Sequence, residues 1–160
     1  MKITNALPKD IDTLLDIYDT ARQFMREHGN DVQWVNGYPK RELLLKNISD
    51  GKLYKVTDGD EIAAVFYFAV EADPTYAVIE GAWKNDSPYG VVHRVAVKSG
   101  KKGTGSAILE WALNKYPHIR VDTHKLNLPM QGLLNKNGFE YCGTIYVEDG
   151  TPRMAFEKII

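Results

Sequence analysis

Residues 91–116 constrain the fold of this chain more than any other stretch. Residues 91–97 are mostly apolar and β-branched, which predicts a buried strand. Residues 100–105 are glycines, lysines and a threonine, and residues 106–116 carry apolar side chains at helical spacing. A strand that passes through a tight glycine loop into an amphipathic helix can hold a phosphate at the helix N-terminus, where free N–H groups and a partial positive charge meet.

The remaining elements give an order of two helices followed by strands, with strands and helices alternating mainly in the second half. We predict helices over residues 9–28, 39–51 and 129–136, and strands over residues 53–57, 61–70, 76–79 (weakly), 119–123, 139–147 and 153–160. Residues 62–70 do not alternate between apolar and polar, so this strand should be buried on both faces. The order predicts an α/β (α+β) fold with a mixed sheet.

Composition narrows the class of protein. A length of 160 residues predicts one domain, and a net charge of −1 offers no general basic surface for nucleic acid or an anionic membrane. The longest apolar run has nine residues, too few to span a bilayer. The single cysteine, Cys142, excludes an intrachain disulfide and a cysteine-rich zinc site, and falls in a predicted core strand as a packing residue. A cytoplasmic protein without nucleic-acid or membrane partners is therefore expected.

The glycine loop lacks a residue that each of two common phosphate-binding motifs requires. A Walker A loop needs a lysine where Ser106 follows the correctly spaced Gly100 and Gly105. A dinucleotide fingerprint that begins at Gly103 and Gly105 needs a third glycine where Ile108 stands. Two interpretations stay open for the loop itself: a pyrophosphate cradle of a third type, or a plain connector with an exposed, lysine-rich face.

Two motifs together resemble the GNAT N-acetyltransferase family. Gly103-Thr104-Gly105 after a strand fits the core of that family's pyrophosphate loop, Arg/Gln-x-x-Gly-x-Gly/Ala. Residues 127–139 are similar to the second signature, in which an Asn at a strand end precedes a short helix and Gly-Phe opens the next strand. The resemblance covers essentially the whole chain. Residues 93–97, 122–124 and 141–143 look similar to one bacterial branch of largely uncharacterised members.

The resemblance implies the GNAT acyl-CoA N-acyltransferase fold, a mixed central sheet with strands 4 and 5 splayed and about four flanking helices. It implies a single domain over residues 1–160. Residues 1–90 would be the substrate side, residues 91–139 the acetyl-CoA-binding part, and residues 139–160 the C-terminal strands. A homodimer is common in the family, and Ile159-Ile160 could pair across a dimer or end an internal strand.

The implied activity is transfer of an acetyl group from acetyl-CoA to a primary amine of a small molecule, amino acid or peptide, by direct attack on the thioester and without a metal. Backbone N–H groups of residues 102–106 would cradle the pyrophosphate, and the backbone of residues 95–97 would pair with the pantetheine arm. The backbone N–H of Val95 or of one of its neighbours would supply the oxyanion donor. The residues implied to bind the cofactor are Val95, Ala96, Val97, Lys101, Lys102, Gly103, Thr104, Gly105, Ser106, Asn127, Met130 and Leu133.

Two departures from the family pattern keep an alternative open. Gly100 stands where the family usually has Arg or Gln, so Lys101 or Lys102 would supply the missing cation. Leu134 stands where many members have a Tyr that protonates the CoA thiolate. The alternative is a non-catalytic acyl-CoA sensor or partner-binding module on the same fold. An ATPase or kinase is disfavoured because Ser106 occupies the lysine position.

The proposed reaction needs a base, because an alkylammonium with a pKa near ~10 must lose a proton before it attacks. His93 is the first candidate, since it lies in the strand that leads to the splay and histidine titrates near neutrality. His124 and Glu80 follow, and Tyr141 is a candidate acid. For each of them the alternative is a hydrogen-bonded or packed structural side chain.

Aromatic residues mark the predicted substrate side. They are Phe24, Trp34, Tyr38, Trp83 and Tyr89. They could hold an amine by cation–π contact, or they could simply cover the core. Asp122 and His124 share one strand face, but two ligands without a third do not make a metal site, so no metal is predicted.

Overall fold

The computed structural model describes residues 1–160 and contains one eight-stranded mixed sheet in the order β1-β2-β3-β5-β6-β8-β7-β4. The strands are β1 Lys2–Asn5, β2 Leu53–Asp58, β3 Glu61–Val70, β4 Glu80–Gly81, β5 Gly90–Val97, β6 His118–Thr123, β7 Glu140–Tyr146 and β8 Pro152–Ile159. The helices are α1 Ile11–Glu27, α2 Arg41–Ser49, α3 Thr104–Lys115 and α4 Leu128–Lys136, with short 3-10 turns η1 Pro8–Asp10 and η2 Pro74–Tyr76. The predicted α/β fold with a mixed sheet and four helices is confirmed.

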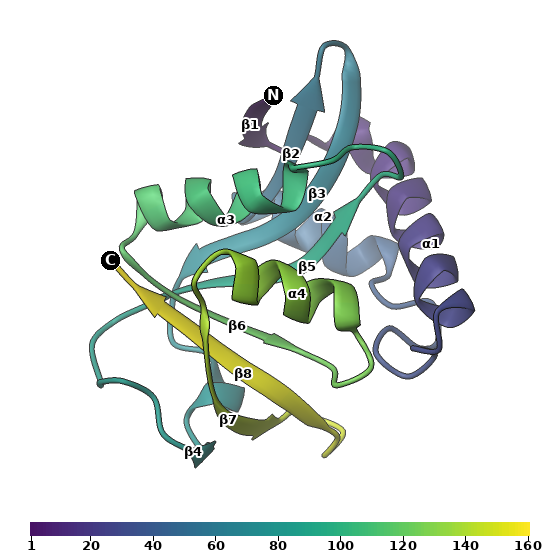
Figure 1. Ribbon diagram of the computed structural model, residues 1–160. Coiled ribbons are helices and arrows are strands. Elements are labelled where there is room, and N and C mark those ends of the chain that lie inside the picture. The colour runs from purple at the N-terminus through teal and green to yellow at the C-terminus, as the bar shows by residue number, and fades with distance from the viewer. The chain divides into compact units, whose positions relative to one another are not determined.

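The chain forms two compact units, and the first comprises Met1–Phe68 and Arg94–Ile108. In it, β1, β2 and β3 pair antiparallel, and α1 and α2 cover one face of these strands (Figure 1). Apolar residues of α1 recur at helical spacing, so Leu14 and Tyr18 are wholly buried. Along β3, every residue from Ala63 to Ala69 is buried, which confirms the prediction of two covered faces.

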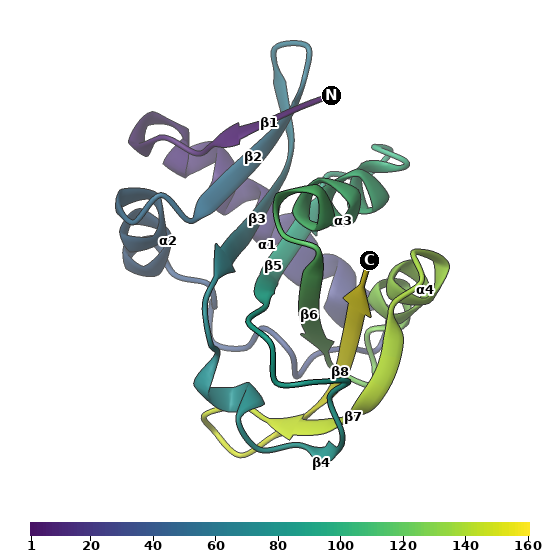
Figure 2. The same cartoon turned by 90° about the vertical axis from the view of Figure 1, so that its left-hand side faces the viewer.

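The second unit comprises Ala69–His93 and Leu109–Ile160. In it, β6 and β7 pair antiparallel with β8, and α4 covers these strands from one side (Figure 2). Ile159 pairs with His118, and the N–H of Ile160 donates to the carbonyl of Pro117 at 2.9 Å. The two terminal isoleucines therefore end an internal strand. None of the helices combines the length and apolarity that crossing a bilayer requires.

If the two-residue strand β4 is left out of the count, β5 and β6 are the fourth and fifth strands along the chain. They pair parallel over only two positions. Gly90 pairs with Ile119 and Val91 with Arg120, and the ladder ends there although β5 continues to Val97. The predicted splay between these strands is thus present.

Three strands differ from the prediction. β1 and β4 were not expected, because strands of four and two residues carry too little alternation to be recognised. The weak strand predicted over residues 76–79 is wrong. The chain instead forms η2, because the Asp73 carboxylate accepts a hydrogen bond from the Thr75 N–H and Pro74 has the backbone angle that a turn needs.

Replacing Gly143 by Ala should destabilise the protein by about 1–3 kcal/mol. Gly143 has a φ of +144°, and a Cβ there would lie 2.1 Å from the backbone carbonyl oxygen of Glu80, so β4 would have to move off β7. Gly132→Ala in α4 is the matched control, since its Cβ meets no atom within 4 Å and a helix favours Ala. Urea unfolding measures both, and equal stability of the two variants would contradict the expected clash.

Candidate functional site

His93 lies between two carboxylates where β5 and β6 stop pairing. His93 and Asp122 each lie two residues beyond Val91 and Arg120, the last pair that β5 and β6 form before they splay. The Nδ1 atom of His93 is 3.8 Å from Oδ2 of Asp122, and Nε2 is 2.9 Å from Oδ2 of Asp73. Asp122 in β6 therefore lies on one side of the imidazole, and Asp73 in the turn after β3 lies on the other.

Asp73 is held by its own turn. Its Oδ1 accepts hydrogen bonds from the Thr75 N–H at 2.9 Å and the Thr75 hydroxyl at 2.7 Å, and its N–H donates to the Tyr89 hydroxyl at 2.9 Å. Burial acts to raise the pKa of Asp73, but the hydrogen bonds from His93 and Thr75 outweigh it and lower this pKa to about 2. Asp73 is therefore a carboxylate at any physiological pH.

Tyr76 fixes the second carboxylate. Its hydroxyl donates to Oδ2 of Asp122 at 2.6 Å, and its ring is buried. Burial and the neighbouring charge of Asp122 raise the pKa of Tyr76 well above its usual value, so the phenol remains a neutral donor. The orientation of Asp122 beside the imidazole is thus set by a second residue of the same unit.

The arrangement defines which imidazole nitrogen can take a proton. A carboxylate can only accept, so in the neutral ring Nε2–H donates to Asp73 and the lone pair lies on Nδ1. An imidazole whose one nitrogen is held by a carboxylate, and whose other nitrogen carries the lone pair, can take a proton from a substrate group.

Asp73→Asn should change how stability depends on pH. The folded-state pKa of about 2 lies below the usual 3.8, so the carboxylate contributes about 2 kcal/mol above pH 4, which is lost as the pH falls towards 2. The stability gap between wild type and variant should therefore be widest above pH 4 and close between pH 4 and pH 2. Asp86→Asn, in an exposed loop, is the control. A gap that does not narrow in acid would contradict the assignment.

Arg94, which the sequence did not single out, follows His93 in β5 with a φ of +52°. A left-handed backbone at a non-glycine residue is strained and needs support. The Tyr18 hydroxyl donates to its carbonyl at 2.7 Å, and its guanidinium donates to Asn47 and Tyr38 and lies 4.9 Å from the Tyr67 ring centroid. These contacts support the left-handed backbone of the residue that directly precedes Val95.

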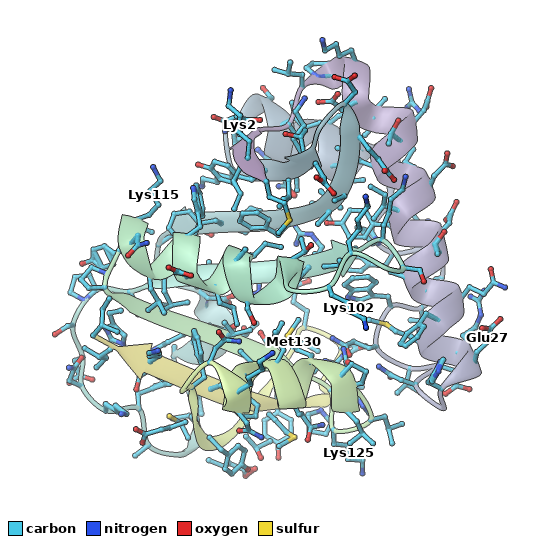
Figure 3. The ribbon with its side chains drawn as sticks, turned by 45° about the horizontal axis from the view of Figure 1, so that its top comes forward. Lys2, Glu27, Lys102, Lys115, Lys125 and Met130 are labelled. Atoms are coloured by element: carbon cyan, nitrogen blue, oxygen red, sulfur yellow. The ribbon has the colours of Figure 1, made fainter.

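The glycine loop has one lysine that forms no ion pair. Lys98 is 2.9 Å from Glu61, and Lys101 is 3.1 Å from both Asp58 and Glu61. The hydrogen bonds that Lys101 donates to the carboxylates of Glu61 and Asp58 raise its pKa. Lys102, marked in Figure 3, is exposed and forms no ion pair, so it is the cation of the loop that can meet a further anion.

Only some backbone N–H groups of the glycine loop are available to donate to a bound anion. Gly103 has a φ of +81° with open space at its Cα, and α3 begins at the next residue. The side chain of Thr104 is buried and donates to the Lys101 carbonyl at 2.8 Å, and its N–H donates to the same carbonyl at 3.4 Å. The family resemblance implies five cradling amides here, and that of Thr104 already donates within the loop.

The remaining predicted cofactor residues lie in β5 and α4. In β5, Ala96 is buried and its neighbours Val95 and Val97 are half-buried. Asn127 caps α4, because its Oδ1 accepts a hydrogen bond from the Met130 N–H at 3.2 Å. On α4 itself, Met130 (marked in Figure 3) and Leu133 are half-buried, whereas Leu134 is wholly buried.

No protein-family model matches this sequence, and neither does any curated protein. Solved structures do match. A GNAT-family acetyltransferase from Streptococcus agalactiae has a TM-score of 0.90 and 31% sequence identity, and the match covers 99% of this chain and 95% of that one. The chain belongs to the GNAT family of acetyltransferases. Acyl transfer is accordingly its general chemistry.

More distant GNAT structures share the fold alone. A GNAT-family acetyltransferase from Listeria monocytogenes has a TM-score of 0.72 at 17% identity, over 99% of this chain and 94% of that one. A ribosomal-protein-alanine N-acetyltransferase from Brucella melitensis has a TM-score of 0.61 at 18% identity, over 100% of both chains.

The other acid–base candidates of this GNAT chain have partners of their own. His124 is buried, and its Nδ1 accepts a hydrogen bond from the Leu126 N–H at 3.1 Å. Burial, with Arg153 nearby, lowers the pKa of His124. Exposed Glu80 accepts a hydrogen bond from the Tyr146 hydroxyl, and Tyr141 lies exposed with its ring edge against Phe156. No group of three or more His, Cys, Asp or Glu side chains is placed to hold a metal ion.

The predicted substrate-side aromatics divide between the two units. In the second, Arg120 lies 4.1 Å from the ring centroids of both Trp83 and Tyr89, so each ring already faces a cation of the chain. In the first unit, Phe24 stacks on His28, Trp34 lies edge-on to Tyr18, and the Tyr38 hydroxyl accepts a hydrogen bond from Arg94. A role of these five residues as acceptor walls stays a prediction.

A buried ionic cluster supports the loop of Trp83 and Tyr89. Glu157 is wholly buried, and its Oε2 accepts hydrogen bonds from Arg120 at 2.8 Å and His118 at 2.5 Å. Its Oε1 accepts from the Lys84 N–H at 2.7 Å. Although burial opposes it, these hydrogen bonds lower the pKa of Glu157. The cluster fixes the loop whose Tyr89 in turn holds Asp73.

Cys142 lies beside this cluster and is half-buried. Its Sγ is 3.9 Å from Oε1 of Glu157. Burial and the charge of Glu157 raise the pKa of the thiol to about 11. The thiol is therefore protonated near neutral pH, which agrees with its interpretation as a packing residue.

Proposed function

We propose that this GNAT protein is an acetyl-CoA-dependent N-acetyltransferase that acts on a primary amine of a small molecule, amino acid or peptide, with His93 as its general base. The observation that carries the proposal is the imidazole of His93 between Asp73 at 2.9 Å and Asp122 at 3.8 Å. Membership of the GNAT family supplies the acyl-transfer chemistry.

The proposed reaction proceeds by direct attack. Nδ1 of His93 takes a proton from the substrate ammonium, and the neutral amine forms a bond to the thioester carbonyl carbon. The nitrogen gives its second proton to water, the carbon–sulfur bond breaks, and the CoA thiolate leaves as the amide forms. The N–H of Val95, which follows the left-handed residue Arg94, is the proposed donor to the oxyanion. Leu134 is wholly buried and has no proton to give, so the thiolate is protonated by the imidazolium or by water.

The pyrophosphate of CoA is proposed to bind at the start of α3. The first turn of a helix has N–H groups without an intrahelical acceptor, and its dipole favours an anion. Gly103 leaves open space at that point, and Lys102 supplies a cation without an ion-pair partner. The pantetheine role of residues 95–97, Asn127, Met130 and Leu133 is proposed from the family resemblance.

Calorimetry with acetyl-CoA and ATP tests cofactor binding. Acetyl-CoA should bind and ATP should not. Gly103→Val should abolish acetyl-CoA binding, because a β-branched residue is strained at a φ of +81° and fills the open space. Gly150→Val is the matched control, since Gly150 has a φ of +83° and open space in another turn. Equal loss of affinity in both variants, or tight ATP binding, would overturn the loop assignment.

Buried Leu134 also favours a second candidate, a non-catalytic acyl-CoA-binding module. A thiol-release assay with polyamines, amino acids, aminoglycosides and peptides separates the two. Release of CoA with at least one amine supports the enzyme. Binding of acetyl-CoA without turnover on any of them supports the module.

A further inference from the structure

A hollow of about 210 Å³ lies at the C-terminal end of α1, where Glu27 is marked in Figure 3, and in the loop that follows. It is lined by Arg22, Met25, Arg26, Asn30, Asp31, Trp34, Val35, Asn36 and Gly37. Sites for drug-sized ligands measure roughly 300–1,000 Å³, so this hollow suits a smaller molecule. All of its lining belongs to the first unit.

Two arginines give one side of the hollow an excess of positive charge. Arg22 and Arg26 are one helical turn apart on α1. The side chain of Arg22 is 11% exposed and pairs with Asp19, whereas the exposed Arg26 forms no ion pair. Burial and the charge of Arg26 lower the pKa of Arg22. An anion bound here would offset that charge, and a planar carboxylate matches a guanidinium best.

A buried acceptor without a partner lies in the same hollow. Asn30 is 3% exposed, and its Nδ2 donates to Oε1 of Gln33 at 3.1 Å. Its Oδ1 is buried and accepts no hydrogen bond from the protein. A buried acceptor left unpaired is costly, so a ligand N–H in the hollow would satisfy it. The carboxylate of Asp31 favours a charged ammonium at that end.

The geometry points to a binding site for a small amino-acid-like ligand. Its carboxylate binds Arg26, its ammonium donates to Oδ1 of Asn30, and its side chain lies against Trp34 and Met25. The site shares Trp34 with the predicted acceptor wall, but binding there requires neither acetyl-CoA nor His93, so it can be tested apart from the proposed acetyl transfer.

Heteronuclear NMR on the full chain without acetyl-CoA tests the site with three isosteric probes. They are L-leucine, L-leucinamide, which lacks the carboxylate, and 4-methylpentanoate, which lacks the ammonium. Leucine should shift the Trp34 indole N–H and the Gly37 amide, and each analogue should bind at least about tenfold more weakly. Similar affinity for all three probes, or binding by none of them, would overturn the proposal.

Two variants assign the groups. Arg26→Gln should weaken leucine binding about tenfold or more while leucinamide binding stays the same. Arg41→Gln is the matched control, since Arg41 is exposed, pairs with Asp12 and does not line the hollow. Asn30→Ala, checked for folding by its thermal midpoint, should remove the preference for leucine over 4-methylpentanoate. Unchanged leucine affinity in Arg26→Gln would overturn the carboxylate assignment.

Discussion

His93→Ala is expected to lower turnover of acetyl-CoA with an amine by about 10²–10⁴-fold at neutral pH, the usual contribution of a general base. The defect should shrink as the pH rises towards ~10, because the amine then loses its proton to solvent. The affinity for acetyl-CoA, measured by calorimetry, should change little, because no contact between His93 and the cofactor is proposed. Steady-state rates from pH 6 to pH 10 measure the effect.

Two further variants separate catalysis from folding. Asp73→Asn keeps the shape of the orienting residue but can donate to the ring as well as accept, so the imidazole tautomer is no longer fixed and turnover should also fall. His28→Ala is the control, because His28 is an exposed histidine that stacks on Phe24. A pH profile identical to wild type in His93→Ala would remove His93 as the base and return His124 and Glu80 to consideration.

Glu157→Ala should destabilise the protein by about 3–5 kcal/mol, because it leaves Arg120 and His118 buried without their carboxylate. In thermal unfolding the midpoint should fall by roughly 6–20 °C. Glu140→Ala removes an exposed carboxylate that pairs with Lys84 and should leave the midpoint unchanged. A small effect of Glu157→Ala would mean that water or a rearranged side chain replaces the lost acceptor.

A combined variant tests the origin of that loss. Replacing Glu157, Arg120 and His118 together by apolar residues of similar volume should recover most of the stability, because no unpaired charge then remains buried. The loop of Trp83 and Tyr89 would lose its anchor on Glu157 and Arg120, so turnover should be lower than in the wild type although the fold is restored.

The strand, glycine loop and helix of residues 91–116 could be predicted because periodicity and turn residues are local signals. His93 could be proposed from its place before the splay. Its carboxylate partners could not be predicted. Asp73 is 20 residues away in the sequence, and an Asp before a Pro is typical of a turn. Asp122 was noticed only as half of a metal pair, since its role depends on the register between β5 and β6.

The partners of the lysines at the glycine loop could not be predicted for the same reason. Three lysines in five residues indicate a local positive charge, but two of them are neutralised by Asp58 and Glu61, which are distant in the sequence and adjacent only through the β2–β3 hairpin. Arg94 was missed for a different reason. Its backbone is left-handed, and a left-handed residue within a strand cannot be recognised from the sequence when it is not glycine.

The high pKa of the Cys142 thiol has a practical consequence. The chain contains no other cysteine, so every protein sulfhydryl that a disulfide dye or maleimide could label is this one. With a pKa of about 11 it is almost entirely un-ionised at assay pH and should react slowly. Colour that develops quickly with such a dye therefore reports released CoA, and the native sequence can be assayed without removing its cysteine.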